Sequence, residues 1–364
     1  MVTLEQIREQ INEIDREMAR LFEARMHAVE SVCAYKRAHG LPITDSSREK
    51  AIIAKNSAYI EDDAIRDFYV NFIQSNVEIS KRYQHRLLQG LRVAYCGVEG
   101  AFAQIAARRI FPDAELIPFG DFHSAYEACE SGECDCAVLP IENSYAGDVG
   151  QVMDILFEGS LFVNGVYDLG VVHNLIGVPG AQIGDIKKVV SHPQALAQCH
   201  RYIKEHHFQS DSFENTAMAA KAVAEAGDKS VAAIASKVTA SLYGLELLDH
   251  DINASNRNTT RFAVISRNQN VRKKHKENHF ILMFTVADET GSLAKAINVI
   301  SDSGFNMSVL RSHPLEGAWQ YYFFVEAVGD IYSKKGQAML KELEQHCDTI
   351  KLIGSYKDVK ELSE

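Results

Sequence analysis

Apolar residues in the first part of the chain recur at the spacing of an α-helix. Residues 4–39 contain no glycine or proline, and Thr3 and Gln6 form a capping box ahead of them. The apolar positions step by three and four: Ile7, Ile11, Ile14, Met18 and Leu21. At 1.5 Å per residue the helix would be about 50 Å long, which a small domain does not cover. We therefore expect it to pair with the same helix of a second chain, in a homodimer or a larger homo-oligomer.

Two more helices are predicted before residue 91. A short one follows Pro42, with Ser46 and Glu49 as its capping box. A longer one runs from about Asp62 to Gln89 and ends at a glycine. Residues 1–90 are therefore expected to form an all-α bundle.

From residue 91 the pattern changes to short strands alternating with helices. LRVAYC, CDCAVLPIE, IKKVVSH, SVAAIAS and TRFAVISR are typical strands, and sequences such as ENTAMAAKAVAEA between them are typical helices. This alternation predicts parallel sheets, and the length of residues 91–270 suits two small α/β lobes with a cleft between them. Pro140 predicts that its strand cannot continue to pair inside a sheet.

Residues 278–364 show a third pattern, with strands and helices in the order βαββαβ. That order is typical of an α+β ferredoxin-like domain. The linker before it carries a basic cluster, Arg272, Lys273 and Lys274, which we interpret as a solvated connector in preference to a patch for an anionic partner.

Composition excludes several classes of protein. The net charge of −11 argues against nucleic-acid binding, which depends on neutralising phosphates. The polar N-terminus predicts no signal peptide, and no apolar run is long enough to span a membrane, so we expect a cytoplasmic protein. The seven cysteines lack the spacing of a metal or redox motif and are expected to be reduced thiols. No metal and no other cofactor is expected.

Two cations continue the apolar stripe of the first helix. Arg25 and Lys36 stand where the pattern requires apolar residues. Two interpretations remain: the side chains extend to water at the end of the stripe, or they line a polar cavity for a ligand that carries carboxylates.

The stretch from IREQINEIDREMARLFEARMHAVE to SSREK resembles the all-helical chorismate mutase family, over essentially the whole of residues 1–90. The resemblance implies that Arg25, Lys36 and the partner chain's Arg8 hold the carboxylates and the ether oxygen of chorismate. It also implies that three residues surround the substrate hydroxyl: Asp45, Arg48 and Glu49. The rearrangement to prephenate moves no proton, so catalysis would rest on restricting the substrate and stabilising charge.

The third helix departs from that family. Many members carry Gln or Glu there to bind the ether oxygen, and this chain is read as having Ser80 at that place. A bridging water or a donor from Asn76 would then substitute.

Polar residues gather where the strands of residues 91–270 meet helices or turns. The motifs are GVEGAF, LPIENS, SHPQAL, ENTA and NTTRF. Each alone is explained by turn chemistry. Five such junctions in one α/β segment predict that they converge on one cleft.

The motifs LPIENS, SHPQAL and TRF resemble the prephenate dehydratase family over residues 91–270. The resemblance implies a two-lobed fold similar to periplasmic binding proteins, and loss of carbon dioxide and water from prephenate to give phenylpyruvate. Thr260 would assist the leaving hydroxyl. Seven residues would bind the substrate: Asn143, Ser144, Ser191, His192, Gln194, Thr216 and Arg261. Two roles stay open, because Arg261 either pairs a carboxylate or braces the turn, and His192 is either a general acid or a cap.

Residues 279–358 resemble an ACT domain, which binds amino acids between paired copies. In dehydratases two stretches of this domain contact phenylalanine. Here they are Gly291, Ser292, Leu293 and Ala294, followed by Leu310, Arg311, Ser312, His313 and Pro314. Arg311 stands where the family has an acid to meet the ammonium of the ligand, so weaker inhibition is expected.

The three segments in this order resemble bifunctional chorismate mutase/prephenate dehydratases. That family acts in phenylalanine biosynthesis and is inhibited by its end product. Two alternatives remain: a dehydratase with a weak or inactive mutase domain, and a non-enzymatic protein that senses amino acids.

Overall fold

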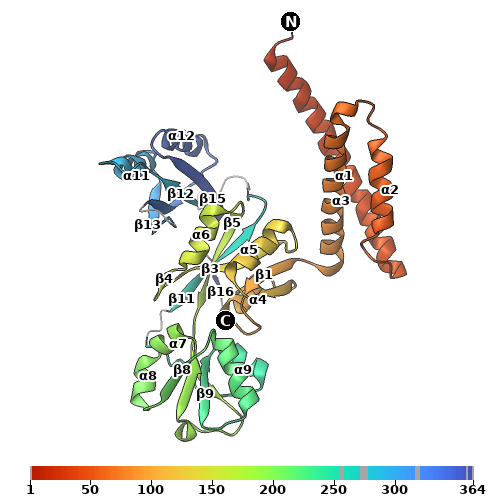
Figure 1. Ribbon diagram of the computed structural model, residues 1–364. Helices are drawn as coiled ribbons and strands as arrows, with labels where there is room; N and C mark the ends of the chain where they lie inside the picture. Colours follow the sequence, from red (N-terminus) through yellow and green to blue (C-terminus); the bar gives the residue numbers. More distant parts are fainter. Residues whose placement is uncertain (1, 255–257, 271–277, 316–319, 358–359, 363–364) are drawn as a thin grey trace. The chain divides into compact units, whose positions relative to one another are not determined.

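The computed structural model describes residues 2–254, 258–270, 278–315, 320–357 and 360–362. The chain divides into two compact units, Met1–Leu91 and Arg92–Glu364 (Figure 1). The basic cluster of the predicted linker, Arg272, Lys273 and Lys274, lies outside the described residues.

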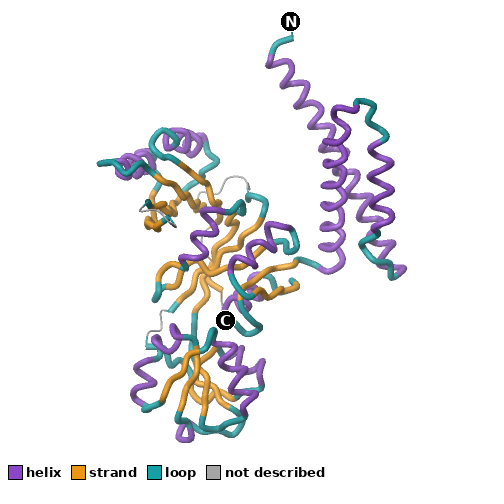
Figure 2. The backbone as a smooth tube through the Cα atoms, viewed as in Figure 1, coloured by secondary structure: helices purple, strands orange, loops and turns teal. Residues whose placement is uncertain are grey.

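The first unit is built from helices and loops alone in its described part (Figure 2). Its helices are α1 (Leu4–His39), α2 (Ser46–Ser57) and α3 (Asp63–Gln89). The capping box of Thr3 and Gln6 is present. The box predicted at Ser46 and Glu49 is wrong, because Asp45 caps α2 one residue earlier by accepting a hydrogen bond from the Arg48 N–H at 3.0 Å.

The predicted apolar stripe of α1 lies on the surface of this single chain. Its five residues are 44% to 59% exposed: Ile7, Ile11, Ile14, Met18 and Leu21. In Figure 1 the N-terminal end of α1 extends beyond α2 and α3. The exposed stripe is the feature on which the expectation of a second chain depends.

The second unit begins with a lobe built on a mixed sheet. Its strands are β1 (Arg92–Cys96), β2 (Glu115–Phe119), β3 (Cys136–Asn143), β4 (Gly147–Asp148), β5 (Phe162–Gly170) and β11 (Thr259–Ser266). β1 pairs in parallel with β2 and β3, as predicted, whereas β11 runs antiparallel between β3 and β5. The helices are α4 (Phe102–Ile110), α5 (Phe122–Ser131) and α6 (Gly150–Glu158).

The prediction that Pro140 ends strand pairing is wrong. β3 continues through Pro140 to Asn143 in the interior of the sheet. A bulge explains this: Arg261 of β11 pairs with Glu142, and the next residue, Phe262, pairs with Pro140, so that Ile141 has no opposite partner. The ladder is already interrupted where proline lacks an N–H.

The second lobe has a five-stranded sheet in the order β10-β6-β9-β7-β8. The strands are β6 (Asn174–Gly177), β7 (Lys188–Ser191), β8 (Gln209–Ser212), β9 (Val231–Ala235) and β10 (Glu246–Asp249). The helices are α7 (Pro193–Gln198), α8 (His200–Glu205), α9 (Thr216–Ala226) and α10 (Lys237–Tyr243). The first two of these helices, α7 and α8, meet at Cys199. Residues 171–173 connect β5 of the first lobe to β6 of the second, and the chain returns to the first lobe between β10 and β11.

The C-terminal segment has the predicted βαββαβ order. Its elements are β12 (Asn278–Thr285), α11 (Ser292–Asp302), β13 (Asn306–Pro314), β14 (Tyr321–Val328), α12 (Lys334–Leu343) and β15 (Thr349–Lys357). The strands lie in the order β13-β14-β12-β15, as in a ferredoxin-like sheet.

This sheet is continuous with the sheet of the first lobe, which the sequence did not predict. β15 pairs with β5 at Gly354 and Val163, and β16 (Lys360–Leu362) pairs with β5 further along. A Cβ at Gly354 would lie 2.0 Å from the carbonyl oxygen of Val163, so this approach requires glycine.

Candidate active sites

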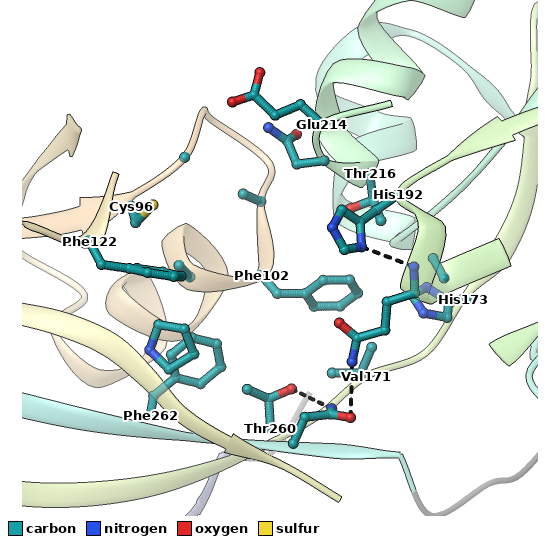
Figure 3. Close-up of a pocket in the computed structure, with 18 of the residues that line it drawn as sticks. Cys96, Phe102, Phe122, Val171, His173, His192, Glu214, Thr216, Thr260 and Phe262 are labelled. Carbon is teal, nitrogen blue, oxygen red and sulfur yellow. Dashed lines mark hydrogen bonds between the residues drawn. The ribbon is translucent and has the colours of Figure 1, made fainter. Parts of the chain in front are cut away.

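A cavity of about 310 Å³ lies between the two lobes of the second unit (Figure 3). Phe102, Phe122 and Phe262 of the first lobe give it apolar walls, and His192 and Thr216 face it from the second lobe. The motifs that were predicted to converge on one cleft all contribute lining residues. Large apolar walls with a few placed polar groups are typical of a small-molecule site.

Asn143 and Thr260 form the polar floor of the cavity. They are directly paired across β3 and β11. The Asn143 amide donates a hydrogen bond of 2.9 Å to Thr260 Oγ1. Thr260 donates its own hydroxyl hydrogen to none of the described residues, so that hydrogen is available to a ligand.

Gln194 connects the two lobes at the same place. Its amide donates to Asn143 Oδ1 at 3.2 Å from the start of α7. His192 is the cap of that helix, with Nδ1 accepting a hydrogen bond from the Gln194 N–H at 3.2 Å. Burial lowers the pKa of His192, so its ring is neutral near pH 7. A neutral ring that serves as a cap does not favour the general-acid interpretation.

Three residues expected at the substrate do not line the cavity: Ser144, Ser191 and Arg261. The hydroxyl of Ser191 is fully buried and donates to the Ile234 carbonyl at 2.6 Å. Ser144 Oγ accepts from the Thr259 N–H at 2.9 Å. Arg261 follows Thr260 on a β-strand, so its side chain points to the opposite face of the sheet.

In the first unit, Arg25 reaches α3. Its guanidinium donates to the hydroxyl of Ser80, and to the carbonyl of Asn76 at 3.3 Å. Burial lowers the pKa of Arg25. Lys36 donates to the carbonyl of Ile43 at 2.6 Å. Arg25, Ser80 and Asn76 are thus brought together, while Lys36 holds the loop before α2.

The remaining predicted residues of this unit are more dispersed. Asp45 caps α2, and Glu49 pairs with Lys81 of α3 at 3.2 Å. Arg48 is on the first turn of α2. Arg8 and Arg25 are 17 residues apart on one helix, roughly 25 Å along its axis, so Arg8 cannot join Arg25 within one chain.

Two family models match this chain. Residues 93–270 match the model described as prephenate dehydratase, and residues 7–85 match chorismate mutase type II. Arogenate dehydratase/prephenate dehydratase 2 of Arabidopsis thaliana is 33% identical over 276 residues, which cover 73% of this chain and 72% of the plant protein. The chain belongs to the prephenate dehydratase family.

Other relatives match almost the whole chain. The bifunctional chorismate mutase/prephenate dehydratase of Aquifex aeolicus (strain VF5) is 29% identical over 368 residues, covering 98% of each chain. The crystal structure of the Arthrobacter aurescens prephenate dehydratase in complex with L-Phe is 26% identical, with a TM-score of 0.69, and covers 74% of this chain and 90% of that one. This dehydratase is an enzyme of phenylalanine biosynthesis that also carries a chorismate mutase domain.

Sequence reasoning missed three buried polar residues beside the dehydratase cavity: His173, Gln198 and Asn258. They are 2% to 8% exposed. Gln198 lies one helical turn after Gln194, and Asn258 is the first residue of the motif NTTRF. A position inside or beside a motif was the signal that was available for these two residues. His173 lies in a connecting segment and had no such signal.

Sequence reasoning also missed Gln84 in the mutase unit. Gln84 is 7% exposed on α3, one turn after Ser80, and its Oε1 has no partner among the described residues. Asn76, Ser80 and Gln84 form an i, i+4, i+8 series on one face. The buried amide of this face thus lies one turn after Ser80, at Gln84.

An ion cluster lies on the face of the dehydratase sheet opposite the cavity. Arg261 pairs with Glu326 of β14 at 3.0 Å and with Glu142 at 3.4 Å. Burial alone would lower the pKa of Arg261, but the hydrogen bond and charge of Glu326 outweigh it and raise the pKa. Arg261 thus joins β11 to β14 of the C-terminal segment, a contact that neither of its two open roles included.

Two residues predicted to contact the effector belong to the same cluster. Arg311 pairs with Glu142 and Asp148, and His313 lies 3.2 Å from Asp148. The strand alternation of β13 leaves Leu310, Ser312 and Pro314 on the exposed side. Arg311 and His313 therefore face the dehydratase lobe, whereas their neighbours face away from it.

Within the described residues, no group of three His, Cys, Asp or Glu side chains is placed to hold a metal ion. In that part of the chain, no helix is long and apolar enough to cross a membrane. Cys96 lines the cavity, and burial raises the pKa of its thiol to about 11, so it is protonated near pH 7.

Proposed function

We propose that the cavity between the lobes binds prephenate and that Thr260 assists the departure of its hydroxyl group. The supporting observation is that Thr260 Oγ1 accepts from Asn143, which leaves its hydrogen free on the cavity side. Loss of carbon dioxide and hydroxide from prephenate consumes one proton and gives phenylpyruvate, carbon dioxide and water. Hydroxide leaves poorly, so a donor at that oxygen lowers the barrier.

A threonine hydroxyl is a very weak acid, so its contribution is a strong hydrogen bond within a proton relay to solvent. Asn143, His192, Gln194 and Thr216 line the same cavity and supply hydrogen-bonding groups to the substrate. Phe102, Phe122 and Phe262 supply apolar walls for the ring. We assign the dehydratase to residues 91–270, after a mutase at 1–90.

In the mutase, Arg25 and Lys36 hold the carboxylates of chorismate, and Gln84 takes the role at the ether oxygen first given to Ser80. Arg25 is half-buried beside the Ser80 hydroxyl, and Gln84 is buried one turn further along α3. Arg8 comes from a second chain paired along the exposed stripe of α1. Asp45, Arg48 and Glu49 lie around the substrate hydroxyl.

Residues 278–364 form an ACT domain through which phenylalanine inhibits the dehydratase. Gly291 caps α11 at a φ of 86° with no side-chain hydrogen bond, so the first N–H groups of the helix can take a carboxylate. Ser292, Leu293 and Ala294 form that first turn. Leu310, Ser312 and Pro314 are on the exposed side of the edge strand β13, where a second copy can approach.

The test is Thr260→Val, which keeps the shape of the side chain and removes the hydroxyl. The kcat for dehydration of prephenate should fall by about 10²-fold, within the range for general acid assistance. Thr259→Val is the matched control, because Thr259 is next in the strand and does not line the cavity. An unchanged kcat with a raised KM would make Thr260 a binding group only. No turnover of prephenate by the wild type would favour the sensor alternative.

A further inference from the structure

The direction of each hydrogen bond beside the cavity follows from two backbone groups. The N–H groups of Tyr145 and Ala146 both donate to one side-chain atom of Asn143, at 3.0 Å each, so that atom is the oxygen. The other atom is therefore the amide nitrogen. It donates to Thr260 Oγ1 at 2.9 Å and to Asn258 Oδ1 at 3.0 Å, and the Thr259 carbonyl lies slightly further away at 3.2 Å.

The same reasoning extends to His173. Because Asn258 accepts through its oxygen, its nitrogen is the atom 2.9 Å from Gln198, and the Gln198 atom is an oxygen. His173 Nε2 lies 2.8 Å from that same oxygen, so Nε2 carries a hydrogen. His173 Nδ1 has no partner among the described residues, and burial lowers the pKa of the ring. His173 is therefore a neutral Nε2–H donor at the end of the network.

We propose that Asn258 and His173 are positioning residues for Thr260. His173 and Asn258 both donate to Gln198, and Asn258 in turn accepts from the Asn143 amide. With that amide held, its N–H occupies the acceptor side of Thr260 Oγ1, and the hydroxyl hydrogen of Thr260 points into the cavity. The inference rests on the proposed role of Thr260 in dehydration.

The burial of the network gives this arrangement its rigidity. Asn143, Asn258, Gln198 and His173 are 7%, 8%, 5% and 2% exposed, so water cannot easily replace a missing partner. Removing Asn258 takes one of three acceptors from the Asn143 amide, leaving Thr260 Oγ1 and the Thr259 carbonyl, and takes one of two donors from the Gln198 oxygen. The amide can then shift toward the Thr259 carbonyl and away from Thr260, and the threonine hydroxyl can turn toward protein acceptors.

The experiment is a double-mutant cycle in the full-length enzyme with prephenate as substrate. Asn258→Ala should lower kcat about tenfold and leave KM nearly unchanged, because one hydrogen bond in a buried network is worth about 1 kcal/mol or somewhat more. In the Thr260→Val background the same substitution should cost nothing further, since it acts through the missing hydroxyl. An equal loss in both backgrounds, or no loss in either, would overturn the proposal.

Two further variants keep the test decisive if Asn258→Ala does not fold. His173→Gln keeps a donor where Nε2–H lies and should retain most of kcat, whereas His173→Leu should lose about fivefold. Equal kcat values for these two would contradict the proposal. Asn174→Ala is the control, because Asn174 is a buried amide of the same lobe that bonds the Ala235 carbonyl and does not line the cavity.

The tautomer of His173 gives a readout that does not depend on activity. Long-range ¹H–¹⁵N NMR with labelled histidine should show a neutral ring protonated at Nε2 down to pH values below the ordinary histidine pKa. An Nδ1–H tautomer would reverse the hydrogen bond to Gln198 and overturn the assignment, and a ring that titrates near 6.5 would contradict the neutral buried donor. If the NMR result overturned the assignment of His173, Thr260→Val would still be expected to lose prephenate turnover. The failure of this inference is therefore distinguishable from a failure of the proposed function.

Discussion

The two proposed sites use charge in opposite ways. In the mutase unit, the cation Arg25 is half-buried beside hydroxyl and carbonyl groups of α3, where we propose that it meets an anionic substrate. In the dehydratase, the polar floor of the cavity is a neutral amide and a neutral hydroxyl, Asn143 and Thr260. The charged neighbours of that pair, Glu142 and Arg261, lie on the other face of the same two strands.

This difference follows from the two reactions. A pericyclic rearrangement moves no proton, so fixed cations near the developing charge are sufficient. Dehydration needs a group that can donate a hydrogen, and a hydroxyl must be oriented for this by its neighbours. The dehydratase therefore needs a rigid strand pair, and the ion cluster with Glu326 and Arg311 braces that pair from behind.

The largest expected effect is on the mutase alone. Arg25→Ala should lower the kcat for chorismate rearrangement by about 10³-fold, because it removes the cation opposite the developing charge. Dehydration of added prephenate should change by less than about twofold, since the two sites lie in different compact units. A coupled assay with each substrate measures both rates.

Arg20→Ala is the control for that variant. Arg20 lies on the same helix, is exposed, and pairs with Glu17. Equal loss of both activities in a folded Arg25→Ala protein would contradict the separation of the sites. Gln84→Ala and Ser80→Ala refine the test: we expect the larger loss of mutase activity at Gln84.

A second effect should fall on the dehydratase unit. Glu326 is 2% exposed and carries the charge opposite Arg261, so Glu326→Ala leaves a largely buried cation short of a partner. Breaking such a pair costs about 3 kcal/mol or more. The urea midpoint of the second unit should fall, and dehydration should fail at lower urea than chorismate rearrangement.

Arg311→Ala is the companion, because Arg311 is 30% exposed and its loss should cost less. If both activities fail together at the same urea concentration in Glu326→Ala, then the brace is not specific to the dehydratase.

The sequence predicted the parts of this fold that depend on local pattern. The bounds of α1 and the βαββαβ order of the last segment follow from periodicity and turn residues. The pairing of Gly354 with Val163 could not be predicted, since it joins residues about 190 positions apart and leaves no periodic signal. Pro140 misled the prediction because a bulge, which depends on the partner strand, removed the usual penalty.

The candidate site, like the fold, was predicted only in part from the sequence. Motifs placed Asn143, Gln194, Thr216 and Thr260 at one cavity. They did not reveal which neighbours point away from it: the exclusion of Arg261 follows from strand alternation once the pairing of β11 is known. His173 could not be found from sequence, because its role depends on contacts with Gln198 across the lobe.

The smallest expected effect concerns regulation of the dehydratase through the C-terminal segment. Phenylalanine should inhibit dehydration, with its carboxylate at the N-terminus of α11. Gly291→Val places a side chain at a φ of 86°, where no other atom lies within 4 Å, and distorts this first turn. Since a helix N-terminus contributes about 0.3–1 kcal/mol to a nearby anion, the inhibition constant should rise about two- to fivefold. Gly304→Val is the control, because Gly304 has a similar φ of 66° just past the other end of the same helix, and its Cβ would meet only the flexible end of the Lys335 side chain, at 2.7 Å. Titration of phenylalanine against prephenate turnover measures both variants. An unchanged inhibition constant in Gly291→Val would place the effector elsewhere, and no heat of binding at millimolar phenylalanine would leave the segment as a brace for the catalytic strands.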